Sequence, residues 1–127
     1  MKNVLLIIVV FVMLACKKKE ENLLLGKWNY IGDREFVKKI STDSIIVDDT
    51  AFGSEGDFIN FMSNGQLTFS MYGDIGSSTY QFLNGNKIVI EDEESPIILL
   101  NKTDLHIRFK DEKHEDTLVQ VTSLFKR

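Results

Sequence analysis

The sequence predicts an all-β protein, an antiparallel meander of about eight strands that closes into a barrel or folds as a two-sheet sandwich. Apolar and polar residues alternate with a period of two over most of residues 23–127, which is typical of strands with one buried face. Asn-Gly pairs at 64–65 and 84–85 lie between such runs and are typical of tight hairpin turns. The 127 residues, of which 43% are hydrophobic, suffice for one domain with a modest core.

Residues 1–15 are predicted to be a signal peptide that does not belong to the fold. Lys2 supplies a positive charge ahead of an uncharged, almost wholly apolar run at residues 4–15. This run is shorter than the roughly 20 apolar residues that a helix needs to span a bilayer. The pattern indicates a precursor that is exported from the cytoplasm.

The chain's only cysteine, Cys16, directly follows this run and precedes three lysines. With Met13, Leu14 and Ala15 before it, the site resembles the lipobox of bacterial lipoproteins, in which leucine is commoner one position earlier. The resemblance implies cleavage before Cys16, acylation of the cysteine with chains such as palmitate, and attachment to the membrane through these chains. Two or three acyl chains anchor a protein durably to a membrane, whereas a single chain anchors it only reversibly. The alternative is an ordinary cysteine in an uncleaved helix.

Residues 16–22 are predicted to be the lipidated cysteine and a polar tether. In lipoproteins an aspartate directly after the cysteine favours the inner membrane, so Lys17 implies the outer membrane of a Gram-negative cell, on its periplasmic or its surface face. Glu20 and Glu21 are similar to an acidic export signal, and a plain spacer is the alternative. Removal of Lys2 leaves 14 of the 15 basic residues beside 19 acidic ones, which argues against nucleic acid as a partner.

The first part of residues 23–127 contains two predicted strands, at 27–31 and 44–47. Between them, the stretch REFVKKI at 34–40 is the one segment with a pattern for a short helix. The acidic, glycine-rich segment 48–57 is predicted to be a long loop at the barrel mouth and is the best candidate for a ligand gate.

Three hairpins and a final strand are predicted to follow. They span 58–72 with a turn at Ser63-Asn64-Gly65, 78–91 with a turn at 84–86, 96–110 with a turn at 101–104, and 117–125 after an acidic loop. Consecutive hairpins with one apolar face form an antiparallel meander.

Three motifs resemble the small lipocalin-like domains of bacterial lipoproteins. They are Gly26-Lys27-Trp28, the FxxNGxLTF pattern at 61–69, and the LxIRF pattern at 105–109. The resemblance covers most of residues 23–127 and implies a lipocalin-like β-barrel in which Gly26 and Trp28 are structural and Trp28 closes the base. It also implies a late arginine over the tryptophan, for which both Arg127 and Arg108 qualify. The middle motif of animal lipocalins is missing.

The sequence contains few side chains in patterns that suit catalysis or metal binding. No Ser-His-Asp order stands out with a supporting turn, and His106 and His114 lack a two-histidine metal spacing. The acidic run at 91–95 lacks the ligand spacing of a calcium-binding EF-hand loop. We therefore expect that the protein is not an enzyme, and that it has no catalytic residues and binds no metal or cofactor.

The barrel interior remains as the candidate site. An eight-stranded barrel is just wide enough to be filled by side chains or to hold one small ligand. The residues expected to point inward and to contact a small hydrophobic ligand are Phe58, Phe69, Met71, Tyr80, Phe82, Leu105, Ile107 and Phe109. If they only pack against one another, the alternative is a filled barrel that contacts other molecules through its exterior loops. Protein partners are not specified by the sequence.

Overall fold

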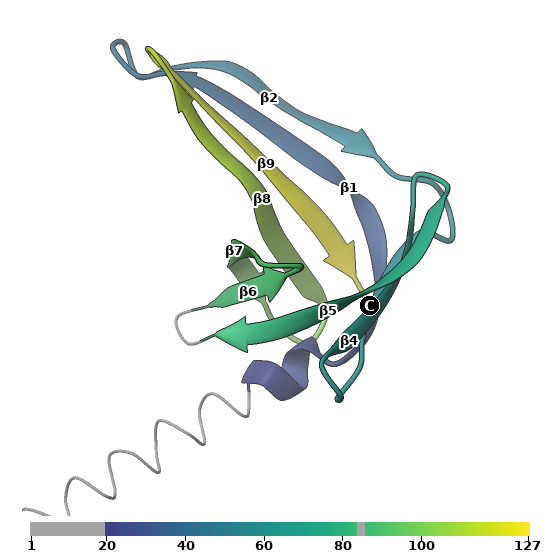
Figure 1. The fold of residues 1–127 in the computed structure, drawn as a ribbon. Coiled ribbons are helices and arrows are strands. Elements are labelled where there is room, and N and C mark those ends of the chain that lie inside the picture. The colour runs from purple at the N-terminus through teal and green to yellow at the C-terminus, as the bar shows by residue number, and fades with distance from the viewer. Residues whose placement is uncertain (1–19, 84–85) are drawn as a thin grey trace, which may run out of the picture.

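A computed structural model describes residues 20–83 and 86–127 (Figure 1). The predicted signal peptide at 1–15, the lipidation site Cys16 and most of the tether lie outside the described residues. The fold begins with a helical turn over residues 20–24. Nine strands follow: β1 (Gly26–Lys39), β2 (Ser44–Phe52), β3 (Phe58–Phe61), β4 (Gln66–Met71), β5 (Asp74–Leu83), β6 (Lys87–Ile90), β7 (Glu93–Leu100), β8 (Asp104–His114) and β9 (Thr117–Lys126).

All neighbouring strands are antiparallel, and eight of the nine close into a barrel. The order is β1-β3-β4-β5-β6-β7-β8-β9, and β9 returns to pair with β1 over Asn29–Lys39. The predicted all-β meander is therefore confirmed, and the closure between first and last strands decides for a barrel over a sandwich.

The strand β1 is longer than predicted because both of its edges are paired. Its first residues, Gly26–Asn29, pair with β3, and Gly32–Lys39 pair with β2 on the same edge, while β9 occupies the other edge. The short helix predicted at 34–40 is wrong, since these residues hydrogen-bond to two neighbouring strands. The long loop predicted at 48–57 is also partly wrong, because residues 48–52 belong to β2.

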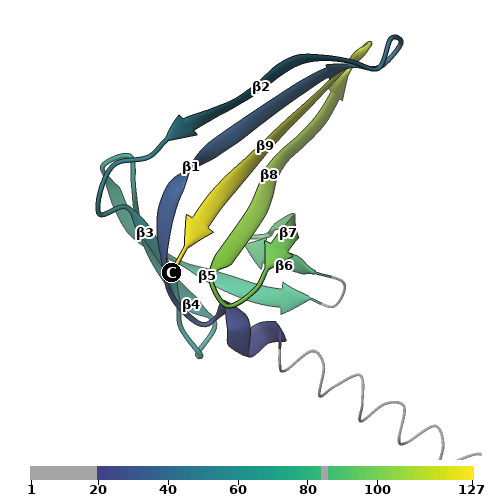
Figure 2. The same ribbon diagram turned by 180° about the vertical axis from the view of Figure 1, so that it is seen from behind.

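A four-stranded sheet projects beyond the barrel and is here called the arm (Figures 1 and 2). It consists of β2, residues 32–39 of β1, residues 117–122 of β9 and residues 108–114 of β8. Most side chains of β2 are exposed, and among the described residues β2 pairs with β1 alone. We call the end of the barrel beside the arm the mouth, and the end beside the helical turn the base.

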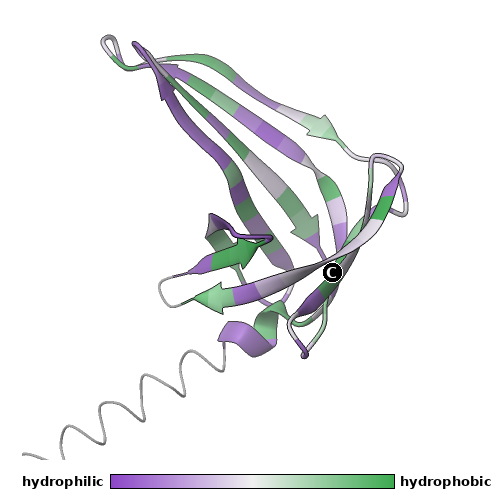
Figure 3. Ribbon diagram, in the orientation of Figure 1, coloured by the Kyte–Doolittle hydropathy of each residue, from purple (hydrophilic) through white to green (hydrophobic). Residues whose placement is uncertain are grey.

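The core fills the barrel from the base upward. Hydrophilic and hydrophobic residues alternate along the strands (Figure 3), and the hydrophobic ones supply the buried side chains. The core residues are Leu24, Trp28, Tyr30, Ile59, Phe61, Leu67, Tyr80, Phe82, Ile88, Ile97, Leu105, Ile107 and Phe125. Burial of this apolar surface is the main stabilising contribution to the fold.

Trp28 and Arg127 close the base together. The Trp28 indole is fully buried and its Nε1 donates a hydrogen bond to Leu24 O at 2.8 Å. The Arg127 guanidinium lies over the Trp28 ring, 3.9 Å from its centroid, and donates to the carbonyl oxygens of Leu23 and Leu25. Of the two candidate arginines, Arg127 is therefore the one that covers the tryptophan.

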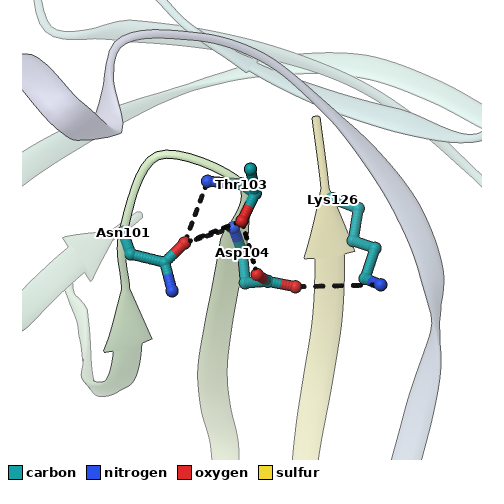
Figure 4. Close-up of polar contacts among 4 residues, drawn as sticks. All are labelled: Asn101, Thr103, Asp104 and Lys126. Atoms are coloured by element: carbon teal, nitrogen blue, oxygen red, sulfur yellow. Dashed lines mark hydrogen bonds and ion pairs between the residues drawn. The ribbon is translucent and has the colours of Figure 1, made fainter.

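Two predicted turns form as expected. Gly65 in the β3–β4 turn has a φ of 81°, a conformation that glycine adopts without strain. In the β7–β8 turn, Asn101 Oδ1 accepts hydrogen bonds from the backbone N–H groups of Thr103 at 2.9 Å and Asp104 at 2.8 Å (Figure 4). Lys126 Nζ lies 4.0 Å from Asp104 Oδ1, so the turn also contacts the end of β9.

Candidate functional site at the barrel mouth

Seven of the eight residues predicted to point inward divide into three groups by burial. Tyr80, Phe82, Leu105 and Ile107 belong to the buried core, and the Tyr80 hydroxyl donates to Met62 O at 2.6 Å. Phe69 and Met71 are half-buried and pack against this core, while Phe109 is 43% exposed.

Phe58 is the exception, because it points away from the barrel interior. On β3 the buried side chains are Ile59 and Phe61, whereas Phe58 lies beneath the Lys27 ammonium, 4.6 Å from its ring centroid. Since side chains alternate along a strand, a shift of one residue moves every member to the other face. The inward placement of Phe58 is therefore wrong, and Ile59 takes its place.

An apolar pocket of about 180 Å³ lies at the barrel mouth. Its lining comes from five strands and one turn: Ile59, Leu67, Phe69, Met71, Ser78, Ile90, Glu91 and Phe109. Three predicted ligand-binding residues, Phe69, Met71 and Phe109, are thus brought together. The other inward residues fill the core and do not line the pocket. Ile59 and Leu67 were missed as lining residues, although the alternation in β3 and β4 carries the signal for them.

Two local features shape this pocket. The Phe69 ring lies over Gly76, its cross-strand partner on β5, and a Cβ at that glycine would be 2.8 Å from Phe69 Cζ. Phe109 occupies a register shift of β8 between Arg108 and Lys110, where a bulge redirects its side chain. Both features leave an aromatic ring at the pocket edge.

A second hollow of about 210 Å³ adjoins the first and is more polar. The two share Ile90, Glu91 and Phe109, and the second adds Glu93 and Ser95. In the tight β6–β7 turn, Glu91 and Asp92 have positive φ values, and the carboxylates of Glu91 and Glu93 lie at the rim. The mouth therefore offers an apolar pocket with an acidic edge.

A cluster of hydroxyl and carboxyl groups ties the β4–β5 turn to the barrel. The hydroxyl oxygens of Tyr30 and Tyr72 are 2.5 Å apart, and Tyr72 Oη lies 3.4 Å from Asp33 Oδ2. Ser123 Oγ donates to Asp33 Oδ1 at 2.6 Å, and Asp57 Oδ2 accepts from Tyr72 N at 3.1 Å. Burial and the hydrogen bond with Tyr72 raise the pKa of Tyr30 far above its ordinary value. The raised pKa keeps the Tyr30 hydroxyl protonated at neutral pH, so this group takes part in the cluster as a neutral hydrogen-bonding partner.

The two histidines lie apart from the mouth pocket. Burial lowers the pKa of His106 on β8, while His114 Nε2 lies 2.9 Å from Glu112 Oε2 on the arm. Over residues 20–83 and 86–127, no group of three or more His, Cys, Asp or Glu side chains is placed to hold a metal ion.

Within the same two segments, no helix has the length and apolar character needed to cross a membrane. The mouth thus combines a small apolar pocket with an adjoining, more polar hollow. No protein-family model matches the chain, and no curated protein is significantly similar to it.

Proposed function

We propose that the protein is a lipid-anchored lipoprotein of the outer membrane whose lipocalin-like barrel binds the apolar end of a small ligand at its mouth. The observation that carries this proposal is the apolar pocket lined by Phe69, Met71 and Phe109. Such a pocket excludes water from an inserted alkyl or aromatic group, which favours binding through the hydrophobic effect.

The size of the pocket limits what it accepts. Its volume of about 180 Å³ is below the roughly 300–1,000 Å³ of a typical small-molecule site and close to a cavity that holds one benzene ring. A ligand therefore inserts one end and leaves its remainder at the second hollow. Because Glu91 and Glu93 line that hollow, the ligand's outer end is neutral or cationic rather than a carboxylate.

The anchor fits the place of the helical turn at residues 20–24, where the described chain begins. Leu24 of the helical turn is buried in the base, so the chain that connects to Cys16 starts at the end of the barrel away from the arm tip (Figure 1). Acyl chains on Cys16 then hold the base toward the membrane and direct the arm away from it.

Native mass spectrometry of the detergent-extracted protein tests the binding proposal. We expect an extra mass that organic extraction removes. The variant Ser78→Phe places a phenyl group in the pocket and abolishes this mass, while Ser77→Phe, on the exposed side of the same strand, retains it. A melting curve for each variant verifies that the barrel is intact.

A second measurement separates the two parts of the mouth. Glu93→Lys weakens the binding of a cationic lipophilic dye and leaves the binding of a neutral one unchanged. If wild type and both serine variants have the bare protein mass and bind no dye, the carrier function is refuted.

An alternative function, an interaction module, is favoured by the exposed apolar side chains near the mouth. Phe52 is 77% exposed and Ile75 is 84% exposed. Phe52 precedes Gly53, which lies against the Tyr30 ring, and Ile75 follows the β4–β5 turn that contains Tyr72, the contact partner of Tyr30. Large exposed apolar side chains that gather in one region are typical of protein-binding surfaces. Loss of a bound protein after Ile75→Asp, with ligand mass unchanged, supports this second function.

A further inference from the structure

We infer that the outer face of the arm holds a second binding site, separate from the mouth, for an oxyanion group such as a carboxylate, sulfate or phosphate. The site is a hollow of about 230 Å³ lined by Arg34, Phe36, Arg108, Gln120 and Thr122. None of these residues lines the mouth pocket.

The strand register places the two arginines on either side of one threonine. Arg34 on β1 and Arg108 on β8 are both direct cross-strand partners of Thr122 on β9. Two strand spacings separate their backbones by about 10 Å, a span that two long side chains can bridge around one small anion. Because Ser123 is buried in the barrel, its neighbour Thr122 and the row of arginines face outward.

Arg108 has hydrogen-bonding capacity that the described part of the chain does not use. Its side chain is only 25% exposed, and its Nε is buried without a hydrogen-bond partner among the described residues. The carboxylate of Asp111 lies 3.9 Å from Nη1, too far for a hydrogen bond. A guanidinium has donors and no acceptor, and a buried donor without a partner is unfavourable. Because Nε itself is buried, an oxyanion in the hollow accepts from the Nη groups of Arg108, which also belong to this guanidinium.

Arg34 is held in position by the carboxylate of Asp48. Its Nε and Nη2 donate to the two oxygens of Asp48 at 2.7 and 2.8 Å, and this pair holds the pKa of Asp48 below its usual range. The bidentate contact fixes the guanidinium plane and leaves Nη1 to donate to a ligand.

The charges around the hollow determine how it recognises a ligand. Asp48 and Asp111 offset the two arginines, so recognition depends on the geometry of the donors more than on net positive charge. Gln120 Nε2 donates to Asp111 Oδ1 at 3.1 Å and keeps that carboxylate at the side of the site. The Phe36 ring forms an apolar wall, which favours an oxyanion that is carried on a small ring, such as an acidic sugar.

Nuclear magnetic resonance of the full chain in zwitterionic lipid nanodiscs tests this site. The probe is glucuronate, with glucose as the neutral control, titrated at constant ionic strength. We expect a saturable shift of the Arg108 Nε–H signal with glucuronate and none with glucose. Inorganic sulfate and nanodiscs that contain anionic lipid then distinguish an acidic sugar from a free anion or a lipid headgroup as the natural source.

Matched variants separate recognition from general charge. Arg108→Lys keeps the charge but removes the Nε donor and the fork, so affinity falls about tenfold or more. Lys113→Met removes a charge from the same strand at a position outside the hollow, and its affinity stays within about twofold of wild type. The absence of a saturable Arg108 signal shift with every probe, or equal losses in the two variants, overturns the inference.

Discussion

Removal of the Arg127 side chain is expected to loosen the base of the barrel. In the variant Arg127→Ala the protein loses the stacking of the guanidinium on Trp28 and its hydrogen bonds to Leu23 O and Leu25 O. An exposed cation–π contact contributes about 0.5–1 kcal/mol. Each hydrogen bond contributes about 0.5–1.5 kcal/mol, and the exposure of Arg127 places both near the lower end. We therefore expect the free energy of unfolding to fall by about 2 kcal/mol.

Urea denaturation followed by circular dichroism measures this change. A loss of about 2 kcal/mol lowers the urea midpoint by about 1 M for a small protein. Lys126→Ala is the matched control, because Lys126 is the preceding residue and its nearest carboxylate is 4.0 Å away, so we expect a change below about 0.5 kcal/mol. Arg127→Lys is expected to lie between, since lysine keeps the charge but loses the planar stacking. A midpoint for Arg127→Ala equal to that of Lys126→Ala would refute the account of the base.

Two further predictions concern the mouth and the tyrosine cluster. Gly76→Val displaces the Phe69 ring, because a Cβ there is 2.8 Å from Phe69 Cζ; we expect a loss of about 1–3 kcal/mol in the same urea assay and weaker dye binding, whereas the exposed Ser77→Val changes neither. Since burial raises the pKa of Tyr30 in the folded state, alkaline pH ionises this tyrosine first in the unfolded state. The ionisation of Tyr30 therefore leaves the stability unchanged below about pH 10. The stability falls as the pH rises further, and denaturation at stepped pH measures this loss. Tyr30→Phe should have a shallower alkaline loss, and an equally steep loss in this variant contradicts the role given to Tyr30.

Local sequence signals were sufficient where neighbours along the chain decide the structure. The β3–β4 hairpin is one example, since Asn64-Gly65 suits the turn and the residues on either side alternate. The β7–β8 turn at Asn101 is another, because its side chain bonds to backbone only two and three residues away.

The predictions are wrong where pairing with strands distant in the sequence decides the structure. Residues 34–39 carry a weak helical pattern, but pairing with both β2 and β9 makes them a strand. The sequence predicts the wrong face for Phe58, because the four residues of β3 are too few to fix which side chains point inward. Its pairing with Asn29 on β1 fixes this. The bulge at Phe109 depends on how β8 meets β9, so no local pattern signals it. The same holds for the choice of Arg127 over Arg108 as the cover of Trp28.

The closure of the barrel between β1 and β9 also sets the order of events during folding. The pairs between β1 and β9 range from Lys39 with Thr117 to Asn29 with Lys126. The two strands are therefore synthesised far apart in time. Contacts between residues so distant in sequence slow folding, because the loop must close before they form. Until residues 117–126 are present, one edge of β1 has no neighbour and is open to pairing with other chains. For the exported precursor that we propose, this edge of β1 stays open until the last strand has crossed the membrane.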